Sequence, residues 1–223
     1  MQEILEQLLL DLDQSISSVS YNDNVMDNQD NSSMIINNIK THVSGEGGEY
    51  QSFCSSLLFE SQSPPNLLAF LLRSIGRKNL KVARQSTLEF ITSYIKQVGK
   101  EHIDPHAHSI FATCITIYRE DSGEHTIQTH ACKPIKHLLR FGIVNLDNLD
   151  NVNLHELEGS ITSNSQYSND NKNSIENENE NIQEHGVILE KLYKLLMDDI
   201  NSSKHNTKKS EVLKVLGLLV KAF

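Results

Sequence analysis

Histidine and cysteine side chains, which bind zinc, gather in the middle of this sequence. His102, His106 and His108 lie close together, and His130 is followed two residues later by Cys132. Paired in space, they would supply enough ligands for a zinc ion. Structural zinc sites, however, use CxxC or Cys/His pairs at tighter, recurrent spacing. We therefore favour histidines on the surface and at helix ends, and we expect no metal and no cofactor.

A cysteine nucleophile is the second chemistry that the residue types suggest. Cys114 or Cys132 with His130 would place a thiol beside a base. Cys114 falls on an apolar helix face beside Phe111 and Ile115, where cysteine usually acts as a small hydrophobic residue. The motifs GxGxxG, GxxxxGK[ST], HRD, DFG, GxSxG and HExxH do not occur. We expect this chain alone to catalyse nothing, and a small cysteine hydrolase is kept as the third hypothesis.

A group of cations stands out in a chain whose net charge is −9 at pH 7. We call it the basic hairpin, and it consists of Arg73, Arg77, Lys78, Lys81 and Arg84. Arg73 and Arg77 are one helical turn apart, and Lys81 and Arg84 are about one turn apart on the helix expected next. Such a hairpin would present several cations at one edge, which is a candidate contact for nucleic-acid phosphates. A solvated hairpin is the simpler interpretation.

A second, weaker group of cations consists of Lys133, Lys136 and Arg140. The acidic net charge argues against a protein that coats nucleic acid with its whole surface, but many acids lie in or beside two Asn-rich stretches. A local basic patch is therefore compatible with the composition.

Apolar residues at helical spacing predict an all-α fold. The expected boundaries come from turn residues: Pro64-Pro65 opens one helix, Asn79 caps the next, and Asp104-Pro105 opens another. Pro134 must kink its helix or mark its first turn, because proline lacks the donor that a helix interior requires. A short helix is expected around Leu154 to Leu157.

Composition divides the chain into four parts. Residues 1–49 are expected to form N-terminal helices with a polar linker, 50–159 HEAT-like helical repeats, 160–183 a disordered Asn-rich insertion, and 184–223 a further repeat. The polar stretch from Asn22 to Ser33 is also expected to be disordered or loosely ordered, since folding it would cost chain entropy without apolar burial.

Turn signals in the middle region recur at a spacing that gives antiparallel helix pairs of roughly 40 residues, the length of HEAT and armadillo units. We therefore predict a HEAT/armadillo-like α-solenoid with Asn-rich insertions; a compact helical bundle is the alternative. The last helix stays apolar up to Val220 and has no polar capping helix after it, although stacked repeats need one. From this we expect the chain to be part of a longer protein.

Cys54, Cys114 and Cys132 are odd in number and lack CxxC spacing, which favours a reducing compartment, cytosolic or nuclear. The N-terminus reads as an amphipathic helix and not as a signal peptide. No apolar run approaches the roughly 20 residues that span a bilayer.

The dense helical region resembles the extreme N-terminal region of DNA-dependent protein kinase catalytic subunits. It reads SLLFESQSPPNLLAFLLRSIGRKNLKVARQSTLEFITSYIKQVGKEHIDPHAHSIFATCITIYREDSGEHTIQTHACKPIKHLLRFG. The later stretches ILEKLYKLLMDDI and VLKVLGLL are similar to the helices that follow in that family. The resemblance covers Leu57 to Leu146 and Ile188 to Leu218. The Asn-rich insertion and the first fifty residues depart from the family pattern.

The resemblance implies a HEAT-like arm of a giant serine/threonine kinase of the phosphatidylinositol-3-kinase-related group, which repairs double-strand breaks by non-homologous end joining in the nucleus. In that family the arm helps to encircle DNA and to receive the Ku heterodimer, while the catalytic residues lie thousands of residues further on, so none is carried over. The implied partners are double-stranded DNA ends, Ku and the rest of the kinase chain, with no membrane and no small-molecule substrate. The alternative is a free-standing helical adaptor that binds proteins.

Overall fold

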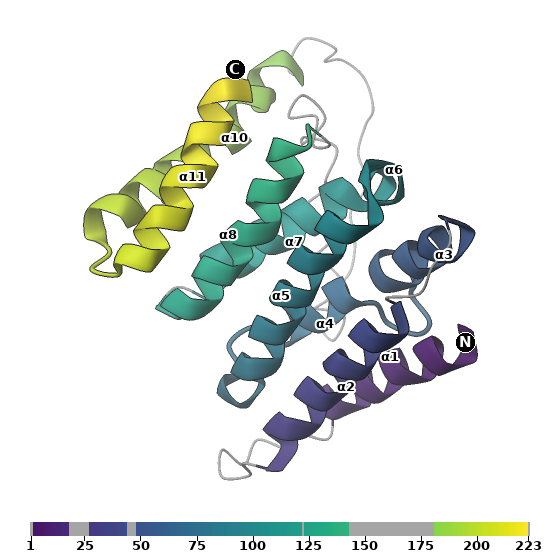
Figure 1. The fold of residues 1–223 in the computed structure, drawn as a ribbon. Coiled ribbons are helices and arrows are strands. Elements are labelled where there is room, and N and C mark those ends of the chain that lie inside the picture. Colours follow the sequence, from purple (N-terminus) through teal and green to yellow (C-terminus); the bar gives the residue numbers. More distant parts are fainter. Residues whose placement is uncertain (1, 18–26, 44–47, 122, 143–180, 223) are drawn as a thin grey trace, which may run out of the picture.

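The computed structural model describes residues 2–17, 27–43, 48–121, 123–142 and 181–222, and these residues form helices joined by turns (Figure 1). The described part of the chain contains no strand, so the predicted all-α class is confirmed. None of its helices combines the length and the apolar character that a membrane crossing needs.

The helices follow one another with short connections. In order they are α1 (Gln2–Ser17), α2 (Asp27–Val43), α3 (Gly48–Phe59), α4 (Leu67–Arg73), α5 (Lys81–Val98), α6 (Lys100–Ile103), α7 (Ala107–Glu120), α8 (His125–Arg140), α10 (Asn181–Ser202) and α11 (Asn206–Ala222). Two 3₁₀ turns, η1 (Lys78–Leu80) and η2 (Asp104–His106), lie directly before α5 and α7.

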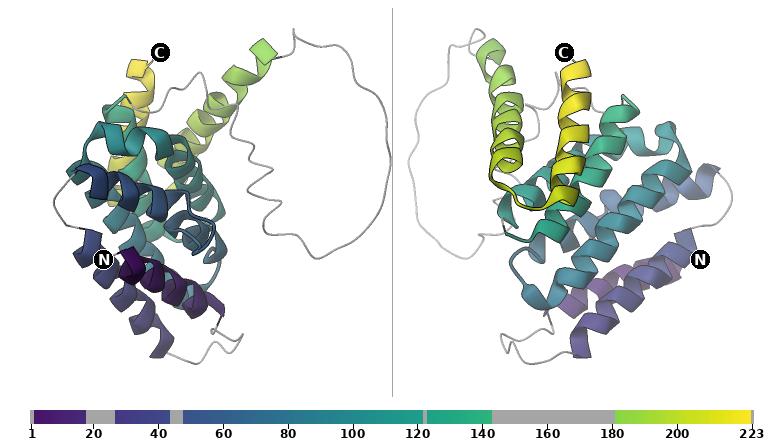
Figure 2. Two further views of the ribbon diagram at one scale, coloured as in Figure 1. Left: turned by 90° about the vertical axis from the view of Figure 1, so that its right-hand side faces the viewer. Right: turned by 60° about the vertical axis from the view of Figure 1, so that its left-hand side comes forward.

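The helices form two layers (Figure 1 and Figure 2). In one layer α2, α5, α8 and α11 lie side by side, each in contact with the next. In the other, α4 contacts both α1 and α7. Helices adjacent in sequence connect the layers, because α1 packs on α2 and α7 packs on α8. This arrangement has the layers that a HEAT-like solenoid requires, and a regular superhelix stays a prediction.

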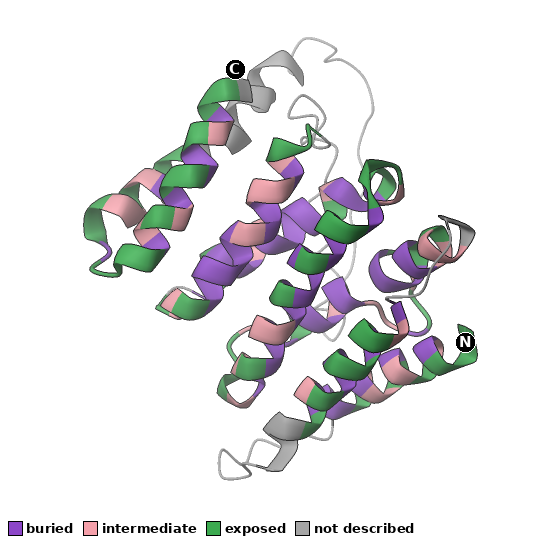
Figure 3. Ribbon diagram, in the orientation of Figure 1, coloured by how far each residue is buried: buried purple, intermediate pink, exposed green. Residues whose placement is uncertain are grey.

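The core lies between the two layers, where the apolar stripes of the helices meet (Figure 3). Leu5 and Leu12 of α1 and Ile36 and Ile39 of α2 are almost completely buried, as their spacing predicts. Burial of such a side chain contributes about 1.5–3 kcal/mol to stability. Because aliphatic side chains predominate in this interior, their packing holds the helices in place.

Two predicted helix starts are wrong in detail. The N-cap of α4 is Asn66, whose side chain accepts a hydrogen bond from the Ala69 amide at 2.9 Å, so the helix begins after the prolines. Asn79, the expected cap of α5, lies inside η1 instead. The residue before α5 is Leu80, and no side chain caps that helix.

One further boundary differs from the expectation, and one choice at a proline is settled. Asp104 begins η2 directly after α6, and α7 begins only at Ala107. Pro134 lies inside α8, which continues to Arg140. Of the two choices that the sequence leaves, Pro134 therefore does not mark the first turn of its helix, and a kink at this residue stays a prediction.

The predicted disorder from Asn22 to Ser33 is wrong for its second half, because α2 begins at Asp27. Ser32 is buried there, and its hydroxyl donates to Ser15 Oγ at 2.9 Å. Helix α10 already begins at Asn181, inside the stretch expected to be disordered. The expected helix at Leu154 to Leu157 and residues 160–180 lie outside the described residues, and the four-part division stays a prediction.

Candidate nucleic-acid interface

Arg84, the last cation of the basic hairpin, is 1% exposed and lies inside the protein. Its Nε is 3.1 Å from Asp121 Oδ2, and its Nη1 donates hydrogen bonds to the Arg77 carbonyl at 2.9 Å and to the Ser74 carbonyl. Burial lowers the pKa of Arg84, while the charges of Asp121 and Glu124 oppose that change. The guanidinium therefore holds the loop between α4 and α5 in place from the interior of the protein.

Asp121, the partner of Arg84, follows the end of α7 and is 4% exposed. Its Oδ1 accepts a long hydrogen bond from the Gly76 amide at 3.4 Å. Gly76 has a φ of 73°, a left-handed conformation that favours glycine. The α4–α5 loop is thus joined to α7 by one buried ion pair and by a backbone contact.

The arginines at the start of the basic hairpin are joined to α1. Arg73 forms an ion pair with Asp13, and Arg77 Nη1 donates to the Ile16 carbonyl at 2.8 Å. Because α4 ends at Arg73, Arg77 lies in the following loop, and the expectation that both share one helical turn is wrong. These contacts satisfy a carbonyl in the last turn of α1, where cations also interact favourably with the helix dipole.

The two lysines of the basic hairpin are open to solvent, as Arg73 and Arg77 also are. Lys81 Nζ is 2.5 Å from Glu124 Oε2, and the side chain is 41% exposed. The pKa of Glu124 is lowered chiefly by its hydrogen bond with Lys81, with smaller effects of Arg84 and Lys78. Lys78 is exposed. The cationic edge that the sequence predicts is therefore corrected: Arg84 does not belong to it, and whether the other members touch nucleic acid stays a prediction.

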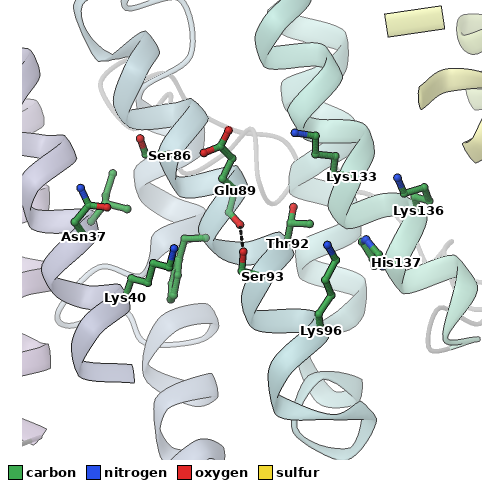
Figure 4. A pocket seen from close by; sticks show the side chains of 12 residues that line it. Asn37, Lys40, Ser86, Glu89, Thr92, Ser93, Lys96, Lys133, Lys136 and His137 are labelled. Carbon is green, nitrogen blue, oxygen red and sulfur yellow. Dashed lines mark hydrogen bonds between the residues drawn. The ribbon is translucent and has the colours of Figure 1, made fainter. Parts of the chain in front are cut away.

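A second set of cations lines a groove of about 440 Å³ between α2, α5 and α8 (Figure 4). Its ionisable members are Lys40 from α2, Glu89 and Lys96 from α5, and Lys133, Lys136 and His137 from α8. Asn37, Ser86, Thr92 and Ser93 add polar groups, and Ile36 and Phe90 add apolar ones. We call this set the cationic groove.

Helical spacing brings the groove cations together. Lys133 and Lys136 are one turn apart on α8, and Lys96 lies on α5, the neighbouring helix of the same layer. Figure 4 shows Lys96 extending toward His137, with Lys40 across the groove on α2. Lys136 also pairs with Glu211 of α11 at 2.6 Å. Among the described residues, Lys96 and Lys133 form no ion pair.

The pKa of His137 reflects the charges around the groove. Burial lowers its pKa to about 4, and the positive charges of Lys96, Lys136 and Arg140 contribute, whereas Glu211 acts in the opposite direction. An imidazole whose protonation is opposed by three neighbouring cations lies in a positive potential. The groove is therefore an environment that favours an anion.

Sequence reasoning found only part of this groove. The group of Lys133, Lys136 and Arg140 was recognised, but Lys40 and Lys96 come from two other helices and form no cluster in the sequence. Their positions on the solvent side of amphipathic helices were the available signal. Placing them next to α8 required the order of the helices within the layer.

The histidines proposed for zinc have other partners. His102 Nδ1 is 2.9 Å from Ser52 Oγ, and His106 Nδ1 is 3.0 Å from Glu60 Oε1. His130 Nε2 is 2.7 Å from Glu89 Oε1. Within the described ranges, no three or more His, Cys, Asp or Glu side chains lie together as a metal site would require.

The cysteines are unsuited to nucleophilic attack. Cys114 and Cys132 are fully buried, and burial raises the pKa of Cys114 to about 12 and that of Cys132 likewise upward. A thiolate is therefore strongly disfavoured at neutral pH. His130, the base considered for them, directs its ring nitrogens to Glu89 and to the Thr126 carbonyl at 2.7 Å. This geometry argues against a cysteine hydrolase.

The described residues form a helical region, and the comparisons with known proteins indicate its kind. Residues 52–141 match the family described as DNA-PKcs, N-terminal. A stretch of 66 residues is 33% identical to the DNA-dependent protein kinase catalytic subunit of Gallus gallus. That match covers 30% of this chain and 2% of the chicken protein. No solved structure matches the chain.

These findings confirm the resemblance predicted from the sequence, because the matched residues run from α3 to α8 and include the basic hairpin. The match also includes two of the three walls of the cationic groove, α5 and α8. The helical region is thus similar to the N-terminal region of DNA-PKcs.

Proposed function

We propose that this chain is the N-terminal, non-catalytic helical part of a nuclear DNA-dependent protein kinase catalytic subunit. Its role would be that of a scaffold that receives DNA ends and the Ku heterodimer during non-homologous end joining. The observation that carries the proposal is the match of residues 52–141 to the DNA-PKcs N-terminal region. The two layers of helices support it, since stacked helix pairs present extended surfaces to large partners.

To test the proposal, the 223-residue chain is mixed with labelled duplex DNA of several sequences. Its affinity for each duplex is measured by fluorescence anisotropy across a series of salt concentrations. Sequence-independent binding that weakens with salt is expected, because contacts to phosphates release counterions. Ku is then added to the same duplexes, and a ternary complex is expected on DNA with free ends. Absence of DNA binding at low salt would contradict the DNA-end role.

A different result would favour the adaptor hypothesis. A free-standing adaptor binds a protein partner in a manner insensitive to salt and has no affinity for DNA ends. Ku bound equally well with and without DNA, at low and at high salt, would indicate a protein-binding surface in place of a DNA-binding one.

A further inference from the structure

We propose that the cationic groove between α2, α5 and α8 is a phosphate-binding site that takes the backbone of duplex DNA through Lys40, Lys96 and Lys133. This inference rests on the proposed function and adds to it the surface that contacts the DNA. The basic hairpin, the candidate nucleic-acid contact that the sequence offers, is a separate surface, and its contact with DNA stays a prediction.

Charge complementarity is the first argument. Among the described residues that line the groove, four are lysines and Glu89 is the acidic one; Glu211 of α11 pairs with Lys136. One oxygen of Glu89 has other partners, because Oε1 lies 2.7 Å from His130 Nε2 and accepts a hydrogen bond from Gln85 Nε2 at 3.3 Å. In a chain with a net charge of −9, a concentration of cations on one face of neighbouring helices is unexpected unless an anion binds there.

The width of the groove suits a polymer with many charges. Axes of packed helices lie 8–10 Å apart, so α2 and α8, on either side of α5, are separated by about 16–20 Å. One DNA strand carries a phosphate for each 3.4 Å of duplex axis and winds around that axis, so a distance of about 16–20 Å spans several phosphates of the strand. Lysines on three helices therefore reach several successive phosphates of one strand.

The hydroxyl groups of the groove explain why no base recognition is expected. Thr92 Oγ1 donates to the Leu88 carbonyl at 2.7 Å, and Ser93 Oγ donates to the Glu89 carbonyl at 3.0 Å. Their hydrogens are used within α5, so Asn37, Ser86 and the ammonium groups of Lys96 and Lys133 are among the donors that face a ligand. Ammonium contacts to phosphates position a duplex without reading its sequence.

His137 supplies a reporter for occupancy of the groove. It faces Lys96 from α5, Lys136 and Arg140 from α8, and Glu211 from α11. A phosphate bound beside these lysines neutralises the field that disfavours the imidazolium, so the pKa of His137 rises from about 4 toward its ordinary value when DNA binds. A contact elsewhere on the molecule leaves this pKa unchanged.

The principal experiment compares two double variants of the full chain. Lys96→Gln with Lys133→Gln removes two groove cations that have no ion pair within the described residues. Lys100→Gln with Lys221→Gln makes the same change of charge at exposed positions outside the groove and serves as the matched control. Circular dichroism and urea denaturation establish that both variants fold like the parent chain.

We expect the groove variant to reduce the slope of log K against log salt by about 1.8, since each phosphate contact contributes about 0.9. With equal affinities at 1 M salt, that change of slope corresponds to roughly 60-fold weaker binding at 0.1 M salt. The control variant is expected to bind within about threefold of the parent chain, because distant exposed charges are largely screened. Equal losses in the two variants would overturn the groove assignment and leave the proposed function standing.

The second measurement is an NMR pH titration of His137, alone, with a short duplex and with inorganic phosphate. A raised pKa with duplex and little change with phosphate supports a site for the DNA backbone. An unchanged pKa in the presence of bound duplex overturns the groove as the contact surface. An equal rise of the His137 pKa with inorganic phosphate assigns the groove to free phosphate and overturns the proposal that it binds duplex DNA. If the parent chain does not bind DNA at low salt, both proposals fail.

Discussion

The basic hairpin and the cationic groove are both clusters of cations, but the partners of those cations differ. In the hairpin, Arg84 is buried against Asp121, and Arg77 binds the end of α1. In the groove, Lys96 is exposed and Lys133 partly so, and neither has an acidic partner within the described residues.

The difference lies in what faces each cation. Arginine has a planar fork of donors that can satisfy two carbonyls and a carboxylate at once, which suits an interior position. Lysine is a compact, strongly hydrated charge on a flexible stem, which suits a solvated edge. A cluster of cations in a sequence therefore indicates a binding surface only when its side chains do not pair with an acid or a carbonyl of a neighbouring element.

The largest expected effect comes from Arg84→Met, which leaves Asp121 as a buried charge without its partner. We expect the free energy of unfolding to fall by about 3–5 kcal/mol, as measured by urea denaturation. The double variant with Asp121→Asn should recover a large part of this loss, because both charges are then absent. A loss below about 1 kcal/mol would mean that Arg84 is less important to the fold than its burial indicates.

The next effect is expected from Arg77→Ala, which removes the hydrogen bond to the Ile16 carbonyl. A bond to a charged donor contributes about 1.5–3 kcal/mol, and solvent at this exposed residue reduces the loss toward the lower value. Amide hydrogen exchange should become faster in α1 and stay unchanged in α8. If exchange in α1 does not change, the contact with Arg77 does not hold that helix.

A smaller effect is expected from the pH dependence of His137. Its pKa is about 4 in the folded protein against 6.5 in the unfolded chain. The unfolded state therefore binds the proton first, and stability is lost as the pH falls from about 6.5 toward 4. At pH 5.5 we expect a loss of about 1 kcal/mol. His137→Gln should abolish this part of the pH dependence in denaturation curves between pH 7.5 and 4.5, whereas His108→Gln should retain it.

The smallest effect is expected from Lys81→Gln, which breaks the ion pair with Glu124. An exposed pair contributes about 0.2–1 kcal/mol, and salt reduces it further. If the hairpin contributes no phosphate contact, the salt dependence of DNA binding should be unchanged in this variant. A reduction of the slope by about 0.9 would return the basic hairpin to the DNA-binding surface.

The helices could be predicted because their apolar spacing is a local property. Leu5, Leu12 and Ile16 are buried on α1 as the spacing requires, whereas Ile4, included in the same stripe, is 46% exposed. Helix starts were less predictable, since Asn79 is as suitable a cap as Asn66 and only one of them caps a helix. Asn79 lies in a 3₁₀ turn ahead of α5 and does not cap that helix, and no residue pattern in the sequence distinguishes such a turn from a cap.

The sequence by itself determined that this protein is helical, where its main apolar faces lie, and its resemblance to the DNA-PKcs N-terminal region. Those properties depend on residues close together in the chain and on the order of the segments. Only the tertiary structure decided which cations are internal and which are open. Arg84 became a core residue because α7 brings Asp121 to it, and Lys96 became part of a groove because α5 lies between α2 and α8. Both outcomes depend on the packing of helices distant in sequence, which local spacing does not encode.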